Sequence, residues 1–269
     1  MTQLSIIIPS YNQGTYVGTA IRSALEQPVG DVDVIVVDGG STDDTVDVLK
    51  GFGQRIRWVS EKDKGQADAL NKGLQMARGR IVGWINSDDF YEPGIFGDVL
   101  KAFEDSSVRW VIGNISTFYE QLGKRVRHRS PVISYKTLRR NPDIVRQQGA
   151  FFRKECLQDA GGWDCDFHLA LDYDLWTRLA KRTSPTMVDR YWGCYRIQPG
   201  QKTSGVTIVR QLREIDVILK REGVLHITRV AIRTRKTIHF AKHLIKSLFV
   251  KLGLLDKRYE HLSYSIRNL

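Results

Sequence analysis

Three apolar, β-branched segments each end in a polar turn, and this repeated pattern constrains the fold more than any other feature. The segments are residues 4–8, 32–37 and 81–85, and the turns that follow them read PSYNQG (9–14), DGGSTDDT (38–45) and NSDD (86–89). A strand, a turn and an amphipathic stretch in this order are typical of βαβ units. The sequence therefore predicts an α/β protein with a mostly parallel central sheet flanked by helices. Ligands of such sheets bind beyond the carboxyl ends of the strands.

Two of these turns are acidic. Asp88 and Asp89 are adjacent at the exit of a buried strand, where their carboxylates repel each other. A divalent cation that holds a phosphate explains why both are present. At the end of the second strand, Asp38 has a structural and a functional interpretation that the sequence leaves open. A helix is predicted to start near Thr45, and for Asp43 and Asp44 capping of this helix or a solvated turn is the favoured interpretation.

A third acidic position lies in the segment 170–179. Leu171, Leu175, Arg178 and Leu179 share one face of a helix, and Asp172 falls in its first turn. The helix dipole stabilises a carboxylate there as the anion, which is an ordinary structural role. The same environment would keep a general base ionised.

Composition sets the cellular context that we expect. The chain of 269 residues can bury a substantial core, and it contains no apolar run long enough to cross a bilayer. Its amino terminus enters a strand at once, which does not fit a signal peptide. The three cysteines, Cys156, Cys165 and Cys194, form no CxxC pair, which fits a reducing compartment. We therefore expect a cytoplasmic protein.

Positive charge is concentrated at the carboxyl terminus. Residues 224–269 contain ten Lys and Arg against two Asp and Glu, a net charge of +8 out of +11 for the whole chain. Ile227, Ala231, Thr234 and Ile238 recur at helical spacing, and the same stripe continues with Ala241, Ile245, Leu248 and Leu252. This predicts a basic amphipathic helix that either lies on an anionic membrane or packs on the protein. Nucleic-acid binding is not favoured, because the segment lacks interleaved aromatic residues.

The same shift in charge suggests two domains. We predict a first domain over residues 1–205 and a helical, basic carboxyl-terminal extension over residues 206–269. Within the first domain, residues 113–130 are predicted to form a hairpin with a basic loop at 123–129. That loop is either a solvated run of charges or a lid over an anionic acceptor.

Six sequence blocks together resemble the family-2, GT-A-fold inverting glycosyltransferases, which use nucleotide sugars. The blocks are PSYNQ (9–13), VDGGSTDDT (37–45), SEKDKGQADALNKGL (60–74), INSDDFYEPG (85–94), QQGAFFRKE (147–155) and ALDYDLWTRL (170–179). Any one of them would be weak, but their order over about residues 4–205 makes a chance match improbable. The resemblance implies a GT-A fold with a Rossmann-like central sheet.

The resemblance also implies a nucleotide-sugar site. Pro9 and Tyr11 would shape the nucleoside pocket, and Asp38 would accept a hydrogen bond from the base. A carboxylate there suits uracil or thymine, whose ring N–H is a donor. Asp63 would line the nucleotide and sugar pocket together with its neighbours Lys64 and Gln66.

The catalytic roles follow from the same resemblance. Asp88 and Asp89 would bind Mg²⁺ or Mn²⁺ against the diphosphate, with Asp88 also near the ribose. Asp172 would be the base that deprotonates the acceptor hydroxyl, so that one in-line displacement inverts the anomeric carbon. Two positions depart from the family pattern. Asn86 stands at the first position of the common DxD form, and Gln198 stands where a histidine is frequent.

The function that the sequence predicts is transfer of a hexose or N-acetylhexosamine from a UDP-sugar to a saccharide or lipid-linked acceptor, in cell-surface polysaccharide assembly. The enzyme would be free in the cytoplasm or peripheral on the inner face of the plasma membrane, with no nucleic-acid partner. Two alternatives stay open. One is a noncatalytic sugar- or membrane-binding module on the same fold, and the other is a nucleotidyltransferase.

Overall fold

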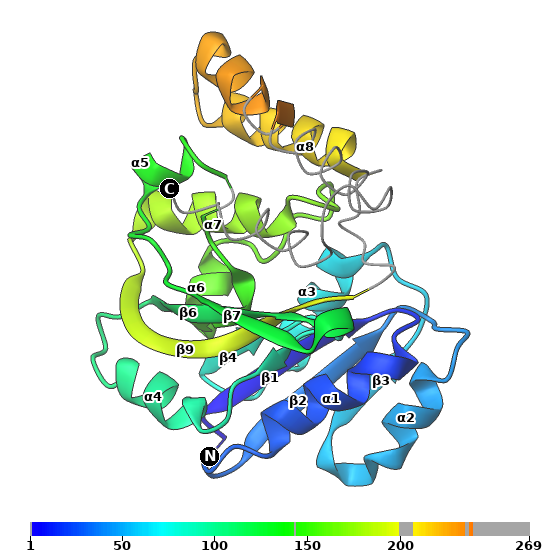
Figure 1. Cartoon of the computed structure of the whole chain (residues 1–269). Helices are drawn as coiled ribbons and strands as arrows, with labels where there is room; N and C mark the ends of the chain where they lie inside the picture. The colour runs from blue at the N-terminus through cyan, green and yellow to red at the C-terminus, as the bar shows by residue number, and fades with distance from the viewer. Residues whose placement is uncertain (1, 143, 199–206, 235–236, 239–269) are drawn as a thin grey trace. The chain divides into compact units, whose positions relative to one another are not determined.

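The computed structural model (Figure 1) describes residues 2–142, 144–198, 207–234 and 237–238 of the chain. The chain divides into two compact units, residues 1–201 and 202–269. The boundary that we predicted at residue 205 falls among residues 199–206, outside the described residues. It stays a prediction.

The first unit is built on one sheet. Its strands are β1 (Leu4–Ser10), β2 (Val32–Asp38), β3 (Arg57–Ser60), β4 (Ile81–Trp84), β5 (Phe90–Tyr91), β6 (Trp110–Tyr119), β7 (Lys124–His128), β8 (Ala150–Arg153) and β9 (Thr186–Ile197). They lie in the order β3-β2-β1-β4-β8-β6-β9-β5, and β7 pairs with β6. The three strands predicted from the apolar segments are β1, β2 and β4.

Parallel pairing is confined to part of this sheet. β3, β2, β1 and β4 are parallel to one another, as are β6 and β9. The remaining pairs are antiparallel. The α/β class is confirmed, and the parallel strands predicted by the βαβ pattern form the amino-terminal half. Ser10, Asp38 and Ser60 are paired in register at the carboxyl ends of β1, β2 and β3.

Helices connect and cover the strands. The α-helices of the first unit are α1 (Gly14–Leu25), α2 (Thr45–Gly51), α3 (Gln66–Met76), α4 (Ile95–Ala102), α5 (Tyr135–Leu138), α6 (Lys154–Asp159) and α7 (Leu171–Arg182). Short 3₁₀ turns are η1 (Gly53–Arg55), η2 (Glu120–Leu122) and η3 (Gln147–Gly149). The predicted helix starts near Thr45 and at residues 170–171 are confirmed by α2 and α7.

Side chains of β1 alternate between the two faces of the sheet. Leu4, Ile6 and Ile8 belong to a buried cluster with residues of α1 and α4. Ile7 points to the other face, where α3 packs so closely that a Cβ on Gly73 would lie 2.3 Å from Ile7 Cγ2. With helices on both faces, the edge at the carboxyl ends of the parallel strands is left for a ligand.

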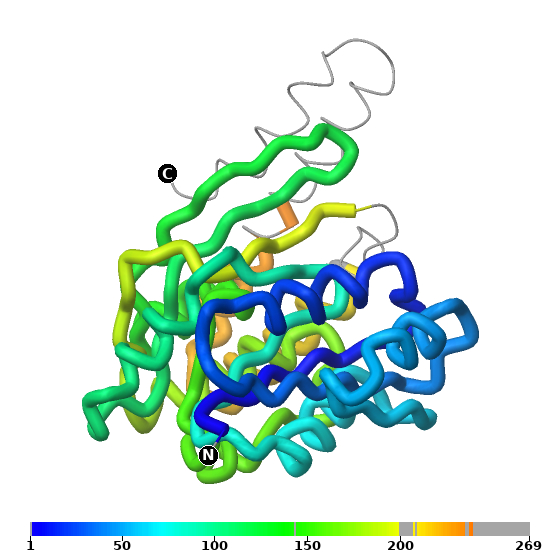
Figure 2. The backbone as a smooth tube through the Cα atoms, turned by 90° about the horizontal axis from the view of Figure 1, so that it is seen from below, coloured from blue at the N-terminus to red at the C-terminus, as the bar shows by residue number. Residues whose placement is uncertain are grey.

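The predicted hairpin at residues 113–130 is confirmed, but its basic segment 123–129, which we expected as a loop, lies mostly in strand β7. β6 and β7 form it, and Figure 2 shows them as two green tubes that run side by side. Its arginines have partners. Arg125 Nη1 donates to Glu92 Oε2 (2.8 Å), and the Arg127 guanidinium lies 5.0 Å from the centre of the Tyr191 ring.

Stacked aromatic rings fix α7 on the sheet. The Trp176 ring lies with its centre 5.3 Å from Phe152, 5.8 Å from Trp110 and 6.1 Å from Trp84. Trp84 also meets Trp163 edge to face at 5.5 Å. Asp172 lies one turn before Trp176, so the stack also fixes the position of the first turn of α7.

The described part of the second unit is helical. It contains α8 (Ile208–Arg221), whose residues Leu212, Ile215, Ile218 and Leu219 are buried, and a further helical stretch at residues 226–234. Most of the predicted basic amphipathic helix, from residue 239 on, lies outside the described residues. None of the helices in the described ranges is both long and apolar enough to cross a lipid bilayer.

Replacing the central ring of the stack tests its importance. We expect Trp176→Ala to lower the free energy of unfolding by about 3–5 kcal/mol, because it removes a buried ring and leaves a cavity. Urea unfolding followed by circular dichroism measures the change. Val132→Ala is the control, since Val132 is 75% exposed and its loss should change stability by less than about 0.5 kcal/mol. Equal effects of the two substitutions would contradict this account.

Candidate active site

The turns after β1 and β2 are held together by side-chain hydrogen bonds. Asn12 N donates to Ser41 Oγ (2.7 Å), and Thr42 N donates back to Asn12 Oδ1 (2.9 Å). Asn12 has a φ of +51°, which asparagine tolerates better than most residues. Two more bonds join Gln13 N to Thr45 Oγ1 (2.9 Å) and Gly14 N to Asp43 Oδ2 (2.9 Å). The two turns therefore form one wall at the carboxyl edge of the sheet.

The residues predicted for the nucleoside pocket differ in exposure. Pro9 is buried within β1, where it is paired with Val37. Tyr11 lies just beyond the strand and is 60% exposed. An exposed aromatic ring at a strand end offers a stacking surface to a planar ligand.

Asp38 is completely buried at the end of β2. Its Oδ2 accepts hydrogen bonds from Ser60 Oγ (2.6 Å), Ser41 N (2.9 Å) and Gly40 N (3.2 Å), and its Oδ1 accepts one from Ser41 Oγ. These donors belong to the turn after β2 and to the end of β3. The buried Asp38 carboxylate therefore holds the turn after β2 in place.

Asp63 lies beside Asp38 in a more open position. A Cβ on Gly39 would lie 2.8 Å from Asp63 Oδ2, so this carboxylate sits directly over Gly39. Its Oδ1 accepts a hydrogen bond from Gly65 N (2.8 Å). Burial raises the pKa of Asp63 above its ordinary value.

The segment from Lys64 to Gln66 leads from this carboxylate to the acidic turn. Lys64 is exposed, whereas Gln66 Nε2 donates to Asn86 Oδ1 (2.7 Å). The same Asn86 oxygen accepts from Trp84 Nε1 (3.1 Å). The structure therefore brings Asp38, Asp63, Gln66 and the start of the acidic turn to one neighbourhood.

Asp89 is buried among hydrogen-bond donors. Its Oδ2 accepts from Gln148 Nε2 (2.8 Å), Gln147 Nε2 (3.2 Å) and Asn86 Nδ2 (3.4 Å), and its Oδ1 accepts from Arg196 N (2.9 Å). The side chain is 1% exposed. Burial, and next the charge of Asp88, raise the pKa of Asp89 well above its ordinary value. Its oxygens are already engaged by the protein on several sides.

Asp88 is more accessible than Asp89. It is partly exposed, and Gln198 Nε2 lies 3.4 Å from its Oδ2. Gln198, the residue that replaces the frequent histidine, therefore contacts the acidic turn.

The side chain of Arg196 binds the main chain of the acidic turn. Its Nε donates to Asp88 O (2.8 Å) and its Nη1 donates to Glu120 Oε1 (2.7 Å). Its guanidinium lies over three rings, with centres 5.2 Å away for Tyr16, 5.2 Å for Phe90 and 5.6 Å for Phe118. Tyr16 OH in turn donates to Glu120 Oε2 (3.0 Å). A buried cation that is ringed by aromatic faces and paired with a carboxylate keeps its geometry well.

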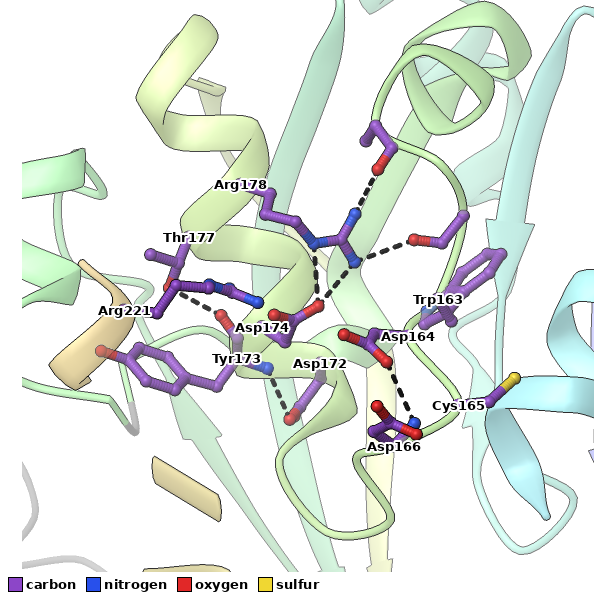
Figure 3. A network of polar contacts seen from close by, with 12 residues as sticks. Trp163, Asp164, Cys165, Asp166, Asp172, Tyr173, Asp174, Thr177, Arg178 and Arg221 are labelled. Carbon is purple, nitrogen blue, oxygen red and sulfur yellow. Dashed lines mark hydrogen bonds and ion pairs between the residues drawn. The ribbon is translucent and has the colours of Figure 1, made fainter. Parts of the chain in front are cut away.

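The first turn of α7 presents Asp172 (Figure 3). Its Oδ1 accepts a hydrogen bond from Tyr173 N (2.7 Å), and the side chain is partly exposed. Asp174 is fully buried and its Oδ2 accepts two hydrogen bonds from Arg178, from Nε (2.8 Å) and Nη2 (2.6 Å). Arg178 also donates to the carbonyls of Ala160 and Gly162. The helix is thus fixed to the preceding loop, with Asp172 in its first turn.

This loop also approaches the Asp63 segment. A Cβ on Gly65 would lie 3.3 Å from His168 Nδ1, four residues before Asp172. On α3, Asn71 exchanges two hydrogen bonds with the main chain of Trp163.

Three contributors to this site were not assigned a role from the sequence. Gln147 and Gln148 stood in one of the family-like blocks without a function, and their amides meet Asp89. Arg196 carried no signal of its own, because its partners lie 76 to 108 positions away along the chain. Only the fold brings them together.

The acidic turn fits a divalent cation that is shared with a ligand. Among the described residues, no group of three or more His, Cys, Asp or Glu side chains is arranged to hold a metal ion alone. Mg²⁺ commonly binds through one or two carboxylates together with the phosphates of a substrate. The partly exposed Asp88 fits that pattern, whereas the buried Asp89 accepts hydrogen bonds at both of its carboxylate oxygens.

The chain resembles known proteins in sequence. A family model described as glycosyl transferase family 2 matches residues 5–160. The chain is 28% identical over 207 residues to chondroitin synthase of Escherichia coli, an alignment that covers 75% of this chain and 30% of that protein. It is 29% identical over 230 residues to an uncharacterized glycosyltransferase of Mycobacterium tuberculosis, covering 83% and 84%. For hyaluronan synthase of Pasteurella multocida the identity is 25% over 231 residues, covering 83% of this chain and 24% of that synthase.

Solved structures share its fold. TarS of S. aureus in complex with UDP-GlcNAc superimposes with a TM-score of 0.65 at 17% identity, over 81% of this chain and 66% of that chain. A mannosyltransferase of Pyrobaculum calidifontis in complex with GDP-Man and Mn²⁺ gives 0.60 at 18% identity, over 97% and 84%. At these identities the likeness concerns the fold, and it confirms the architecture that the sequence resemblance implied.

The two neighbouring carboxylates should differ in their effect on stability. We expect Asp89→Ala to lower the free energy of unfolding by about 2 kcal/mol or more, because buried amide donors lose their acceptor. Asp88→Ala should change it by less than about 1 kcal/mol, since that side chain is partly exposed and its loss removes a repulsion. Urea unfolding of both variants measures the difference. A larger loss in Asp88→Ala would contradict this assignment.

Proposed function

The chain belongs to glycosyl transferase family 2, and we propose that it is an inverting, metal-dependent enzyme that transfers a hexose or N-acetylhexosamine from a UDP-sugar to a saccharide or lipid-linked acceptor. The observation that carries the proposal is the pair of contrasting carboxylates after β4. Asp89 is clamped inside the protein, and Asp88 next to it is left partly exposed at the ligand-binding edge of the sheet.

Several similarities support a nucleotide-sugar donor and a saccharide acceptor. The solved neighbours include one with UDP-GlcNAc and one with GDP-Man. The synthases of chondroitin and hyaluronan are sequence relatives, although the chain spans less than a third of either. Tyr11 provides an exposed ring at the edge where a nucleoside would stack. We place the reaction in cell-surface polysaccharide assembly.

Asp88 is the residue that we assign to the metal, Mg²⁺ or Mn²⁺. A bound cation would stabilise the charge that grows on the departing diphosphate. Arg196 and Gln198 would orient this carboxylate, the first through the Asp88 carbonyl and the second through its side chain. Asp89 would hold the turn that carries Asp88 in place. Lys64 and Gln66 would line the pocket with Asp63.

Asp172 is the residue that we assign as the base. It lies in the first turn of α7, where the hydrogen bond from Tyr173 N orients its carboxyl group. It would take the proton of the acceptor hydroxyl as that oxygen bonds to the anomeric carbon and the bond to the diphosphate breaks. One displacement of this kind inverts the configuration without a covalent enzyme intermediate.

Two variants separate donor binding from catalysis. We expect Asp172→Asn to bind UDP-sugar with Mn²⁺ as the unchanged protein does but to transfer at least 100-fold more slowly, because a general base contributes about that much or more. Asp88→Ala should lose the metal-dependent part of donor binding. Calorimetry with a panel of nucleotide sugars measures binding, and release of nucleoside diphosphate with acceptor measures transfer. Asp47→Asn is the control, since Asp47 is an exposed residue of α2.

The outcomes separate the alternatives. Metal-dependent donor binding without sugar transfer to any acceptor would favour a noncatalytic binding module. Binding and turnover of nucleoside triphosphates would favour a nucleotidyltransferase. Normal turnover in Asp172→Asn would remove that residue from its role.

We further propose that the second unit holds the enzyme on the inner, anionic face of the plasma membrane. The predicted apolar stripe has its described members exposed, with Ile227 at 77% and Ile238 at 50%. The surrounding residues 224–269 carry a net charge of +8. Exposed apolar side chains in a basic segment fit a surface of acidic lipid headgroups.

Full-length protein with Ile227→Glu and Ile238→Glu tests the membrane proposal. We expect its partitioning onto vesicles with phosphatidylserine to fall at least tenfold, because two apolar contacts are replaced by like charges to the lipid. Vesicle sedimentation at low and high salt measures it. Val132→Glu, at an exposed site of the first unit, should bind as the unchanged protein does. Equal binding of all three proteins would instead indicate that the stripe packs within the protein.

A further inference from the structure

Two carboxylates near the carboxyl end of β2 have opposite surroundings. Asp38 is buried, and its oxygens accept hydrogen bonds from two main-chain amides and two serine hydroxyls. Asp63 is partly exposed, and within the described residues only Gly65 N donates to it, at Oδ1. A ligand that needs a carboxylate acceptor at this edge therefore meets Asp63 more readily than Asp38.

Gly39 provides the space that Asp63 occupies. The three atoms closest to a Cβ built on Gly39 all belong to the Asp63 carboxyl group, at 2.8, 3.1 and 3.2 Å. Gly39 does not have a positive φ, whereas the next residue, Gly40, has a φ of +80°. Glycine at position 39 is thus explained by space and glycine at position 40 by conformation.

Both ends of this arrangement are fixed. Gly39 N donates to Ser10 O (2.9 Å), and Glu61 N donates to Asp38 O (3.0 Å). These bonds tie the turn after β2 to β1 on one side and to the segment before Asp63 on the other. Gly39 and the segment that leads to Asp63 are therefore fixed relative to each other by main-chain hydrogen bonds.

Building on the proposed function, we propose that Asp63, and not Asp38, is the carboxylate that reads the base of the donor nucleotide, and that Gly39 is the residue that makes room for it. A carboxylate accepts a hydrogen bond from the ring N–H of uracil or thymine, and likewise from guanine. The corresponding ring nitrogens of cytosine and adenine are acceptors and would be repelled. Asp38 then has a structural role in the turn.

The first test uses the full chain and five nucleoside diphosphates. We expect wild-type protein with Mn²⁺ to bind a diphosphate whose base has a ring N–H, UDP, dTDP or GDP, at least tenfold more tightly than CDP and ADP. In Asp63→Ala that preference should disappear. The affinity for the preferred nucleotide should fall by about ten- to a hundred-fold, which corresponds to the loss of a hydrogen bond to a charged group. The affinities for UDP, dTDP and GDP show which base with a ring N–H the protein prefers.

The second test uses the contact with Gly39. We expect Gly39→Ala to weaken the preferred nucleotide by a similar factor, because the new methyl group displaces the Asp63 carboxylate. In the Asp63→Ala background the same change should have little further effect, so the two substitutions would be strongly non-additive. Gly51→Ala is the matched control, since Gly51 ends α2 with no neighbour of its Cβ within 4 Å. It should bind as wild type does, with an equal or higher thermal midpoint.

Each outcome bears on the inference. Loss of base preference in Asp63→Ala, with non-additive Gly39→Ala, supports it. A preference that survives in Asp63→Ala, or an equal loss for all five nucleotides, would overturn it while leaving the proposed function intact. If the folded wild-type protein bound no nucleotide at all, the proposed function would fail together with it.

Discussion

The buried carboxylate of Asp89 is the interaction on which the rest of the site depends. It accepts hydrogen bonds from the acidic turn itself, from the two glutamines of η3 and from the main chain of β9. These segments are far apart in the sequence, and all three of them donate to this one side chain. A buried carboxylate is tolerated when its lone pairs are satisfied, and its loss leaves several donors without partners.

Around this anchor the site is assembled from two kinds of acidic residue. Asp38, Asp89 and Asp174 are buried and hold protein segments together. Asp63, Asp88 and Asp172 are partly exposed and lie at the carboxyl ends of strands or in the first turn of a helix. Asp88 and Asp172 each lie within two positions of a buried aspartate. Asp63 lies over the turn that the buried Asp38 orders. The buried carboxylates therefore hold the backbone in place, and the partly exposed ones lie toward the edge where ligands of such sheets bind.

Much of this could be predicted from the sequence, since βαβ units and acidic turns leave local patterns. The strands β1, β2 and β4, the starts of α2 and α7 and the β6–β7 hairpin followed from such patterns. The places of β8 and β9 in the sheet did not, because these strands pair with partners that no local periodicity identifies. The different surroundings of Asp88 and Asp89 could not be predicted either. The sequence does not show which of two adjacent aspartates will meet the hydrogen-bond donors of η3 and β9. The roles of Asp172 and the metal remain predictions.

The paired turns after β1 and β2 have a consequence for how a ligand is received. Asn12, Ser41 and Thr42 bond reciprocally, and Gly14 and Gln13 are tied to the second turn as well. A wall that is already ordered loses little conformational freedom when a ligand arrives. Discrimination at this wall would then depend on fit to a fixed surface, so an ill-fitting ligand would be rejected at first contact without a closing movement of these two loops.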